Sequence, residues 1–150
     1  MLDSRRHRGL LSLALLLLVP AFSACSDDEE VEEDPAEAIE IIELTVGGVA
    51  LRLDLDGNVV SGGPLTVAVG ATVPLTARFL DEDGDDISST LGDFELRGTS
   101  PTGVTFASTG DFTGTITGVT AGAGNIRFAL YHVIEQHEDW GPHDVAITVQ

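Results

Sequence analysis

The chain has 150 residues, of which 25 are acidic and 7 basic, and its formal net charge at pH 7 is −18. All the basic residues are arginines, so phosphate loops that need a lysine, Schiff-base chemistry and lysine general bases are excluded. A charge this negative also excludes nucleic acids and disfavours anionic membrane surfaces as partners, because like charges repel.

The first 24 residues are organised like an export signal. Three arginines precede the apolar run Leu10–Val19, and small residues then lead to Cys25, the only cysteine. The apolar run is too short to cross a bilayer, which needs about 20 such residues. The sequence Phe22-Ser23-Ala24-Cys25 resembles the lipobox of bacterial lipoproteins, in which the cysteine is lipidated and becomes the new N-terminus.

This resemblance implies that residues 1–24 are removed and that acylated Cys25 anchors the protein to a lipid membrane. Ser26, rather than aspartate, follows the cysteine, which by the sorting rule of Gram-negative lipoproteins indicates the outer membrane, on its periplasmic or its surface face. An ordinary secretory signal with a nearby cysteine is the alternative. Without residues 1–24, the chain keeps 24 acidic residues against four arginines, a net charge of −20.

Residues 25–38 combine Cys25 with a dense run of like charges. The segment Ser26–Ala38 (SDDEEVEEDPAEA) contains Pro35 and has almost nothing to bury. Such a composition predicts a disordered, self-repelling tether that holds the following domain away from the membrane. A cation-binding tail is the alternative.

Residues 39–150 change in composition to Gly, Thr, Val, Leu and Ala, with short alternating segments separated by Gly or Asp turns. This pattern predicts one all-β domain, a two-sheet antiparallel β-sandwich of about seven to nine strands. The candidate strands are Ile41–Val46, Val49–Leu55, Leu65–Val69, Val73–Phe79, Phe94–Arg97, Val104–Phe106, Phe112–Thr117, Ile126–Leu130 and Val145–Val149.

Three segments of this domain resemble bacterial Ig-like domains of group 2. Leu65–Ala77 (LTVAVGATVPLTA) is similar to the opening of that family, Gly114–Gly122 (GTITGVTAG) to its glycine-marked turn before the penultimate strand, and Val145–Gln150 to its closing strand. The resemblance covers about Gly63–Gln150 and implies an Ig-like sandwich. Members are mostly adhesion, spacer or carbohydrate-surface modules, which implies a noncatalytic role with an envelope protein or glycan as partner.

Two acidic turns are candidate calcium sites, Asp54–Asn58 (DLDGN) and Asp81–Asp86 (DEDGDD). Calcium takes six to eight oxygen ligands, which Asp81, Asp83 and Asp85 could help to supply. The same sequences also suit tight turns, because Asp-Gly and Gly-Asn tolerate positive φ. Neither turn has the twelve-residue EF-hand spacing, so a solvated turn is the preferred interpretation.

The three histidines that follow Cys25 all lie within Tyr131–His143 (YHVIEQHEDWGPH). An antiparallel hairpin in which paired residue numbers sum to 275 places inward side chains opposite each other. The predicted pairs are Ile126 with Val149, Phe128 with Ile147, Leu130 with Val145, and His132 with His143.

Two opposed imidazoles can share a metal ion if a third ligand joins them. His137, Glu138 and Asp139 at the hairpin tip are the candidates, and a cluster of His, Glu and Asp suits zinc, copper or nickel better than calcium or magnesium. In the alternative, His132 and His143 close the end of the sandwich as polar residues that bond to backbone or to nearby carboxylates.

No motif indicates catalysis. The sequence has no Gly-x-Ser-x-Gly elbow, and acylation of Cys25 would remove its only thiol. The sequence therefore predicts a noncatalytic envelope lipoprotein that interacts with a protein or glycan, with transition-metal binding at the hairpin as the alternative function.

Overall fold

The structure is a computed structural model, and it describes residues 34–150. The export signal, Cys25 and most of the acidic tether lie outside the described residues and stay predictions. Residues 34–150 fall within one compact unit. None of their helices has the length and apolar character needed to cross a membrane.

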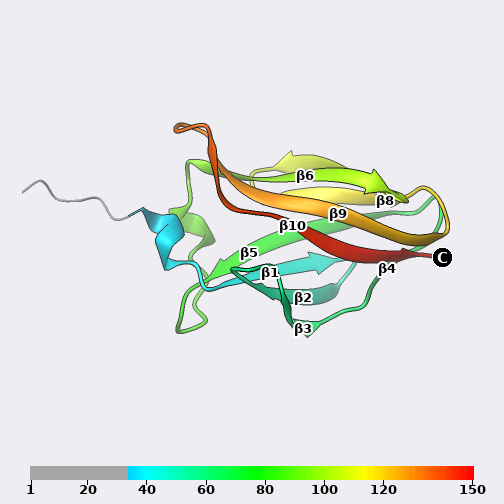
Figure 1. Ribbon diagram of the computed structural model, residues 1–150, viewed down its shortest axis with the longest axis horizontal. Helices are drawn as coiled ribbons and strands as arrows, with labels where there is room; N and C mark the ends of the chain where they lie inside the picture. The colour runs from blue at the N-terminus through cyan, green and yellow to red at the C-terminus, as the bar shows by residue number, and fades with distance from the viewer. Residues whose placement is uncertain (1–33) are drawn as a thin grey trace, which may run out of the picture. The chain divides into compact units, whose positions relative to one another are not determined.

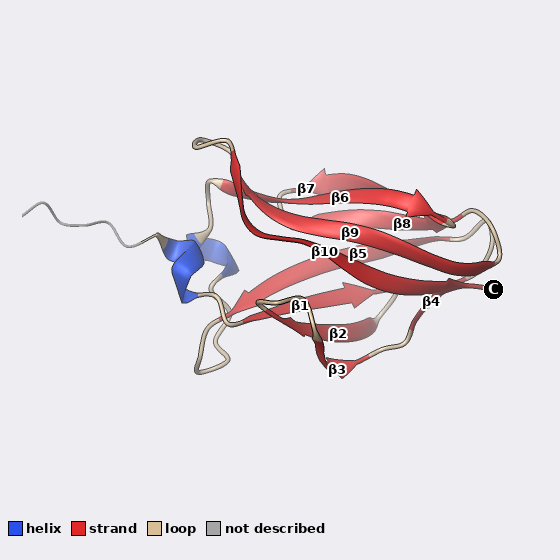
Figure 2. Ribbon diagram, in the orientation of Figure 1, coloured by secondary structure: helices blue, strands red, loops and turns tan. Residues whose placement is uncertain are grey.

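The described residues form ten strands in two sheets that pack face to face (Figure 1, Figure 2). The six-stranded sheet contains, in spatial order, β3 (Val59–Gly62), β2 (Val49–Asp54), β1 (Ile41–Val46), β5 (Thr72–Leu80), β8 (Thr113–Gly118) and β7 (Val104–Gly110). The four-stranded sheet contains β4 (Leu65–Val67), β10 (His137–Val149), β9 (Gly122–His132) and β6 (Phe94–Thr102). The only helices in this part of the chain are two short 3-10 helices, η1 (Pro35–Ala38) and η2 (Ser88–Thr90).

The order of the strands is that of an immunoglobulin-type sandwich. Strands β1, β5, β8 and β7 take the places of A, B, E and D, while β6, β9 and β10 take those of C, F and G. Strand β4 runs parallel to the end of β10, and β2 and β3 extend the larger sheet beyond β1. The predicted all-β, Ig-like sandwich is therefore confirmed, with β3 as a strand that the sequence does not predict.

The core is built from side chains that alternate along the strands. On β9, Ile126, Phe128 and Leu130 have no exposed surface, and on β10, Val145 and Ile147 are 2% exposed. Each large apolar side chain that is fully buried contributes about 1.5–3 kcal/mol to folding. The predicted inward faces of these two strands are confirmed.

The register between β9 and β10 differs from the prediction. Val145 pairs with Ile126 and His143 with Phe128, whereas His132 pairs with His137. The inward faces are unchanged because Ile126 and Phe128 pair with residues four positions earlier on β10 than predicted, and four is an even number. The predicted pairing of His132 with His143 is wrong.

The reason for this shift lies at the tip of the hairpin. A turn over residues 133–136 closes it, with the Gln136 N–H donating to the His132 carbonyl at 2.9 Å and Gln136 at a φ of 61°. Two irregularities in β10, between Glu138 and Trp140 and between Trp140 and His143, take up extra residues. The turn therefore sits nearer to His132 than the prediction assumed.

The start of the domain also differs from the prediction. Residues 35–38, predicted as tether, form η1, whose first turn is capped by the Asp34 carboxylate accepting from the Ala36 N–H at 2.9 Å. Ala36 packs against the core, and Ile39 is 1% exposed. Capping and apolar packing therefore bring these residues into the fold in spite of their charged surroundings.

Candidate metal centre

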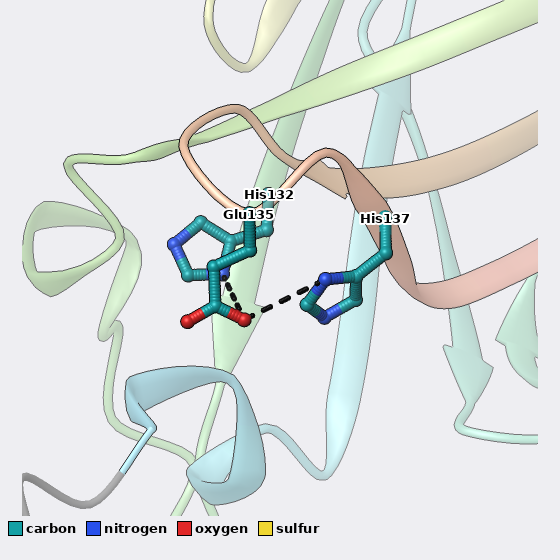
Figure 3. Close-up of side chains that lie close together, drawn as sticks. All are labelled: His132, Glu135 and His137. Atoms are coloured by element: carbon teal, nitrogen blue, oxygen red, sulfur yellow. Dashed lines mark ion pairs between the residues drawn. The ribbon is translucent and has the colours of Figure 1, made fainter.

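Three metal-ligating side chains meet at the tip of the β9–β10 hairpin (Figure 3). His132 ends β9, Glu135 lies in the turn, and His137 begins β10. The Oε2 atom of Glu135 lies 3.8 Å from Nδ1 of His132 and 3.6 Å from Nδ1 of His137. One ligand atom from each residue lies within 4.8 Å of the other two. The short turn thus produces this group, because it places the two histidines opposite each other.

His132 is held firmly by its surroundings. Its ring stacks on Phe94 of β6, with ring centroids 4.3 Å apart and planes 22° apart, and its side chain is 14% exposed. Within the described part of the chain, its Nδ1 atom is buried without a hydrogen-bond partner. A buried polar atom left unpaired costs about 1–3 kcal/mol. A metal ion or another partner at Nδ1 would remove this cost.

His137 is oriented by Asp139. Its Nε2 atom lies 2.9 Å from Oδ1 of Asp139, whose side chain is 14% exposed. This hydrogen bond is the main reason that the pKa of His137 is raised above its ordinary value of 6.5. A carboxylate that accepts from one ring nitrogen leaves the other available to a metal, and here the other nitrogen is the Nδ1 atom that faces Glu135.

The distances suit a small transition-metal ion. In a tetrahedral site with metal–ligand bonds of about 2.0–2.1 Å, neighbouring ligand atoms lie about 3.3 Å apart. The observed 3.6 and 3.8 Å from Glu135 are only a few tenths of an ångström longer. The ligand atoms of the two imidazoles lie within 4.8 Å of each other, so side-chain rotations would have to draw the two rings together around an ion. Two imidazoles and one carboxylate are ligands that zinc, copper and nickel accept, and they leave a fourth position open.

The structure divides the predicted ligands into two sets. It brings His132 and His137 together, but it leaves Glu138 opposite Tyr131 and outside the group. Glu135 takes the place of the carboxylate ligand. The prediction missed this role because it centred the hairpin between His137 and Glu138. A turn centred on Glu135 would have been indicated by the five-residue spacing of the two histidines.

His143 lies away from this group. It pairs with Phe128, four residues along β9 from His132, which corresponds to about 13 Å of strand. Its ring packs against Trp140, with centroids 4.9 Å apart. It also lies so close to Gly57 that an added Cβ there would come within 2.4 Å of it. His143 therefore packs against Trp140 and beside Gly57 and is not part of the group.

The aspartates of the two acidic turns accept hydrogen bonds from backbone N–H groups of the same turns. Oδ1 of Asp81 accepts from the N–H groups of Asp83 at 3.0 Å and Asp85 at 2.9 Å. Asp54 likewise accepts from the Asn58 N–H at 2.8 Å. Across residues 34–150, three His or carboxylate ligand atoms come within 4.8 Å of one another only at His132, Glu135 and His137. The structure therefore does not gather the predicted calcium ligands Asp81, Asp83 and Asp85 in this way.

Comparisons with known proteins identify no family. No protein-family model matches the chain, and a search of curated proteins finds no match. One solved structure that matches is the crystal structure of domains 4 and 5 of the S-layer protein SbsC, at 13% sequence identity and a TM-score of 0.41, over 72% of this chain and 75% of that one. A likeness this distant carries no conclusion about this chain.

Proposed function

We propose that this chain is an exported, lipid-anchored and noncatalytic module of the cell envelope whose Ig-like domain binds a transition-metal ion. The observation that carries the metal-binding part is the meeting of His132, Glu135 and His137 at the hairpin tip. The lipobox-like sequence that ends at Cys25 supports the anchor, and Ser26 supports the outer membrane as its location.

The chemistry of the site favours zinc, copper or nickel over calcium. Calcium takes six to eight oxygen ligands, whereas this group offers two imidazole nitrogens and a carboxylate. Imidazole binds a metal only when it is neutral, so binding releases protons and weakens as the pH falls. Capture or sensing of a metal ion at the envelope is the role that this site would serve.

The sandwich is the rigid support of the site in this proposal. His132 is fixed by its stacking on Phe94, and His137 by its bond to Asp139. Sites carried by regular strands and supported by neighbouring side chains keep their geometry better than sites on long loops. An envelope protein or glycan stays a proposed partner, through loops or an exposed strand edge such as that of β3.

Calorimetric titration tests the metal-binding part. The protein, purified in mild detergent, is titrated separately with Zn²⁺, Cu²⁺, Ni²⁺ and Ca²⁺, together with the variants His132→Ala and His137→Ala. His143→Ala is the matched control, since it removes an imidazole from the same hairpin but outside the group. Circular dichroism checks that each variant is folded.

We expect one transition-metal ion per chain with submicromolar affinity, loss of this binding in His132→Ala and His137→Ala, and retention in His143→Ala. Weak binding that none of the three substitutions changes would contradict the proposal. Equal loss of binding in His143→Ala would also contradict it, because that histidine lies outside the group.

A further inference from the structure

We propose that Asp34 supplies the fourth ligand of this metal site, so that a bound ion ties the hairpin tip to the beginning of the sandwich. The inference rests on the metal-binding part of the proposed function. It adds a residue that lies about one hundred positions away in the sequence, next to the short helix η1.

A shared cavity brings the two segments together. Its volume is about 330 Å³, and its walls include Asp34 and Pro35 from the start of the domain and His132 and Glu135 from the hairpin. Figure 3 shows the coil of η1 on the side to which the Glu135 carboxylate points. Asp34 therefore faces the same space as two of the three proposed ligands.

The carboxylate of Asp34 can serve both its turn and a metal. Its Oδ1 atom accepts the capping hydrogen bond from the Ala36 N–H at 2.9 Å. A carboxylate has a second oxygen with its own lone pairs, so Oδ2 can bind a cation while the cap is kept. Asp34 lies outside the group whose ligand atoms come within 4.8 Å of one another, so its side chain has to turn toward the ion to fill the fourth place of a tetrahedral site.

The charges around the cavity also favour a cation. Asp34, Asp93 and Glu135 all line it, and no arginine does. The four arginines of the described residues are paired elsewhere, Arg52 with Glu43, Arg78 with Asp86, Arg97 with Glu95 and Arg127 with Asp144. A divalent cation between these carboxylates would offset their mutual repulsion, and the nearest of them would gain by coordinating it.

The consequence is a metal-dependent connection. With the ion bound, Asp34 would tie η1 to the β9–β10 tip, in addition to the cap, the packing of Ala36 and the burial of Ile39. Metal occupancy would then control how firmly η1 is held against the hairpin tip.

The test compares Asp34→Asn with Glu37→Gln in the purified protein, using Zn²⁺ as the probe. Asparagine is as good an N-cap as aspartate, so η1 is preserved. Glu37→Gln removes the same charge from the same segment, but Glu37 does not line this cavity. Two readouts are measured, the Zn²⁺ affinity by calorimetry and the hydrogen exchange of the amides of residues 36–39.

We expect Asp34→Asn to weaken Zn²⁺ binding by at least about 10-fold, because losing even a group that only orients the ligands costs about 10- to 100-fold. Glu37→Gln should bind like the wild type, and Zn²⁺ should slow exchange at residues 36–39 in the wild type but not in Asp34→Asn. If both variants bind Zn²⁺ as tightly as the wild type, or if the wild type binds without protection of residues 36–39, the role of Asp34 is refuted while the three-residue site stands. If the wild type does not bind Zn²⁺, the proposed metal function fails and this inference fails with it.

Discussion

Replacement of Gly118 by alanine should destabilise the sandwich because the backbone that follows β4 passes too close. Gly118 ends β8, and an added Cβ would lie 2.5 Å from the Ala68 carbonyl oxygen and 3.0 Å from Cγ1 of Val149. Its φ lies outside the left-handed region, so the close approach alone requires glycine. A Cβ essentially never comes within 3.0 Å of an atom outside its own and the adjacent residues, and the backbone must therefore move by about 0.5 Å.

Hydrogen bonds oppose this movement. The Gly118 N–H donates to the Ala71 carbonyl at 3.0 Å, and the Gly70 N–H donates to the Gly118 carbonyl at 2.8 Å. Overpacking of this kind lowers the free energy of unfolding by about 1–3 kcal/mol. Alanine also restricts the unfolded chain more than glycine does, which raises the free energy of unfolding by about 0.4–1 kcal/mol. We expect a net loss of about 1–2 kcal/mol, or a fall in melting temperature of about 4 °C for each kcal/mol.

The assay is thermal and urea unfolding followed by tryptophan fluorescence. Trp140 is the only tryptophan and is 5% exposed, so its emission reports on the core. Gly92→Ala is the matched control, because nothing lies within 4 Å of its added Cβ and its φ is not left-handed. The control should be unchanged or slightly more stable. Equal stability of the two variants would refute the reasoning.

Three further predictions concern single groups. Hydrogen bonds, of which the one from the Ser88 side chain has the largest effect, lower the pKa of Asp86 from 3.8 to about 2. This carboxylate therefore stabilises the fold above pH 3.8, and the stabilisation is lost as the pH falls toward 2. Ser88→Ala should raise the pKa of Asp86 in a carboxyl NMR titration, and an unchanged pKa would contradict this cause. Because the pKa of His137 is raised, its protonated form stabilises the fold below pH 6.5, and this stabilisation is lost as the pH rises through the raised pKa. Asp139→Asn should lower the pKa of His137 in an imidazole NMR titration, and an unchanged pKa would rule out Asp139 as the cause. Cys25→Ser should abolish labelling by palmitate and release the protein from membranes, while labelling that persists would disprove lipidation at this residue.

The strands of this domain could be predicted because most of them bury one face. Alternation of apolar residues, as at Ile126, Phe128 and Leu130, is a direct signal of such a strand. Strand β3 escaped prediction because all of its residues are exposed, which leaves no alternation to read. An edge strand that is exposed to solvent on both faces therefore cannot be recognised from the alternation of apolar residues.

The candidate site was harder to predict than the fold. The numbers of paired residues sum to 275 in the predicted register and to 271 in the observed register over most of the hairpin. Both registers place the same side chains of β9 and β10 inside, so the apolar pattern cannot distinguish the two registers. The turn over residues 133–136 and the irregularities on either side of Trp140 decide the register. These features depend on local backbone geometry, and they determine that His132 meets His137 rather than His143.

The most direct test of the account is to locate the metal by anomalous diffraction from crystals of the protein grown with Zn²⁺. We predict one zinc ion at the hairpin tip, about 2.0–2.2 Å from Nδ1 of His132, from Nδ1 of His137 and from a carboxylate oxygen of Glu135. Zinc bound instead at His143 or in the acidic turn at residues 81–86, or no bound zinc at all, would contradict the account.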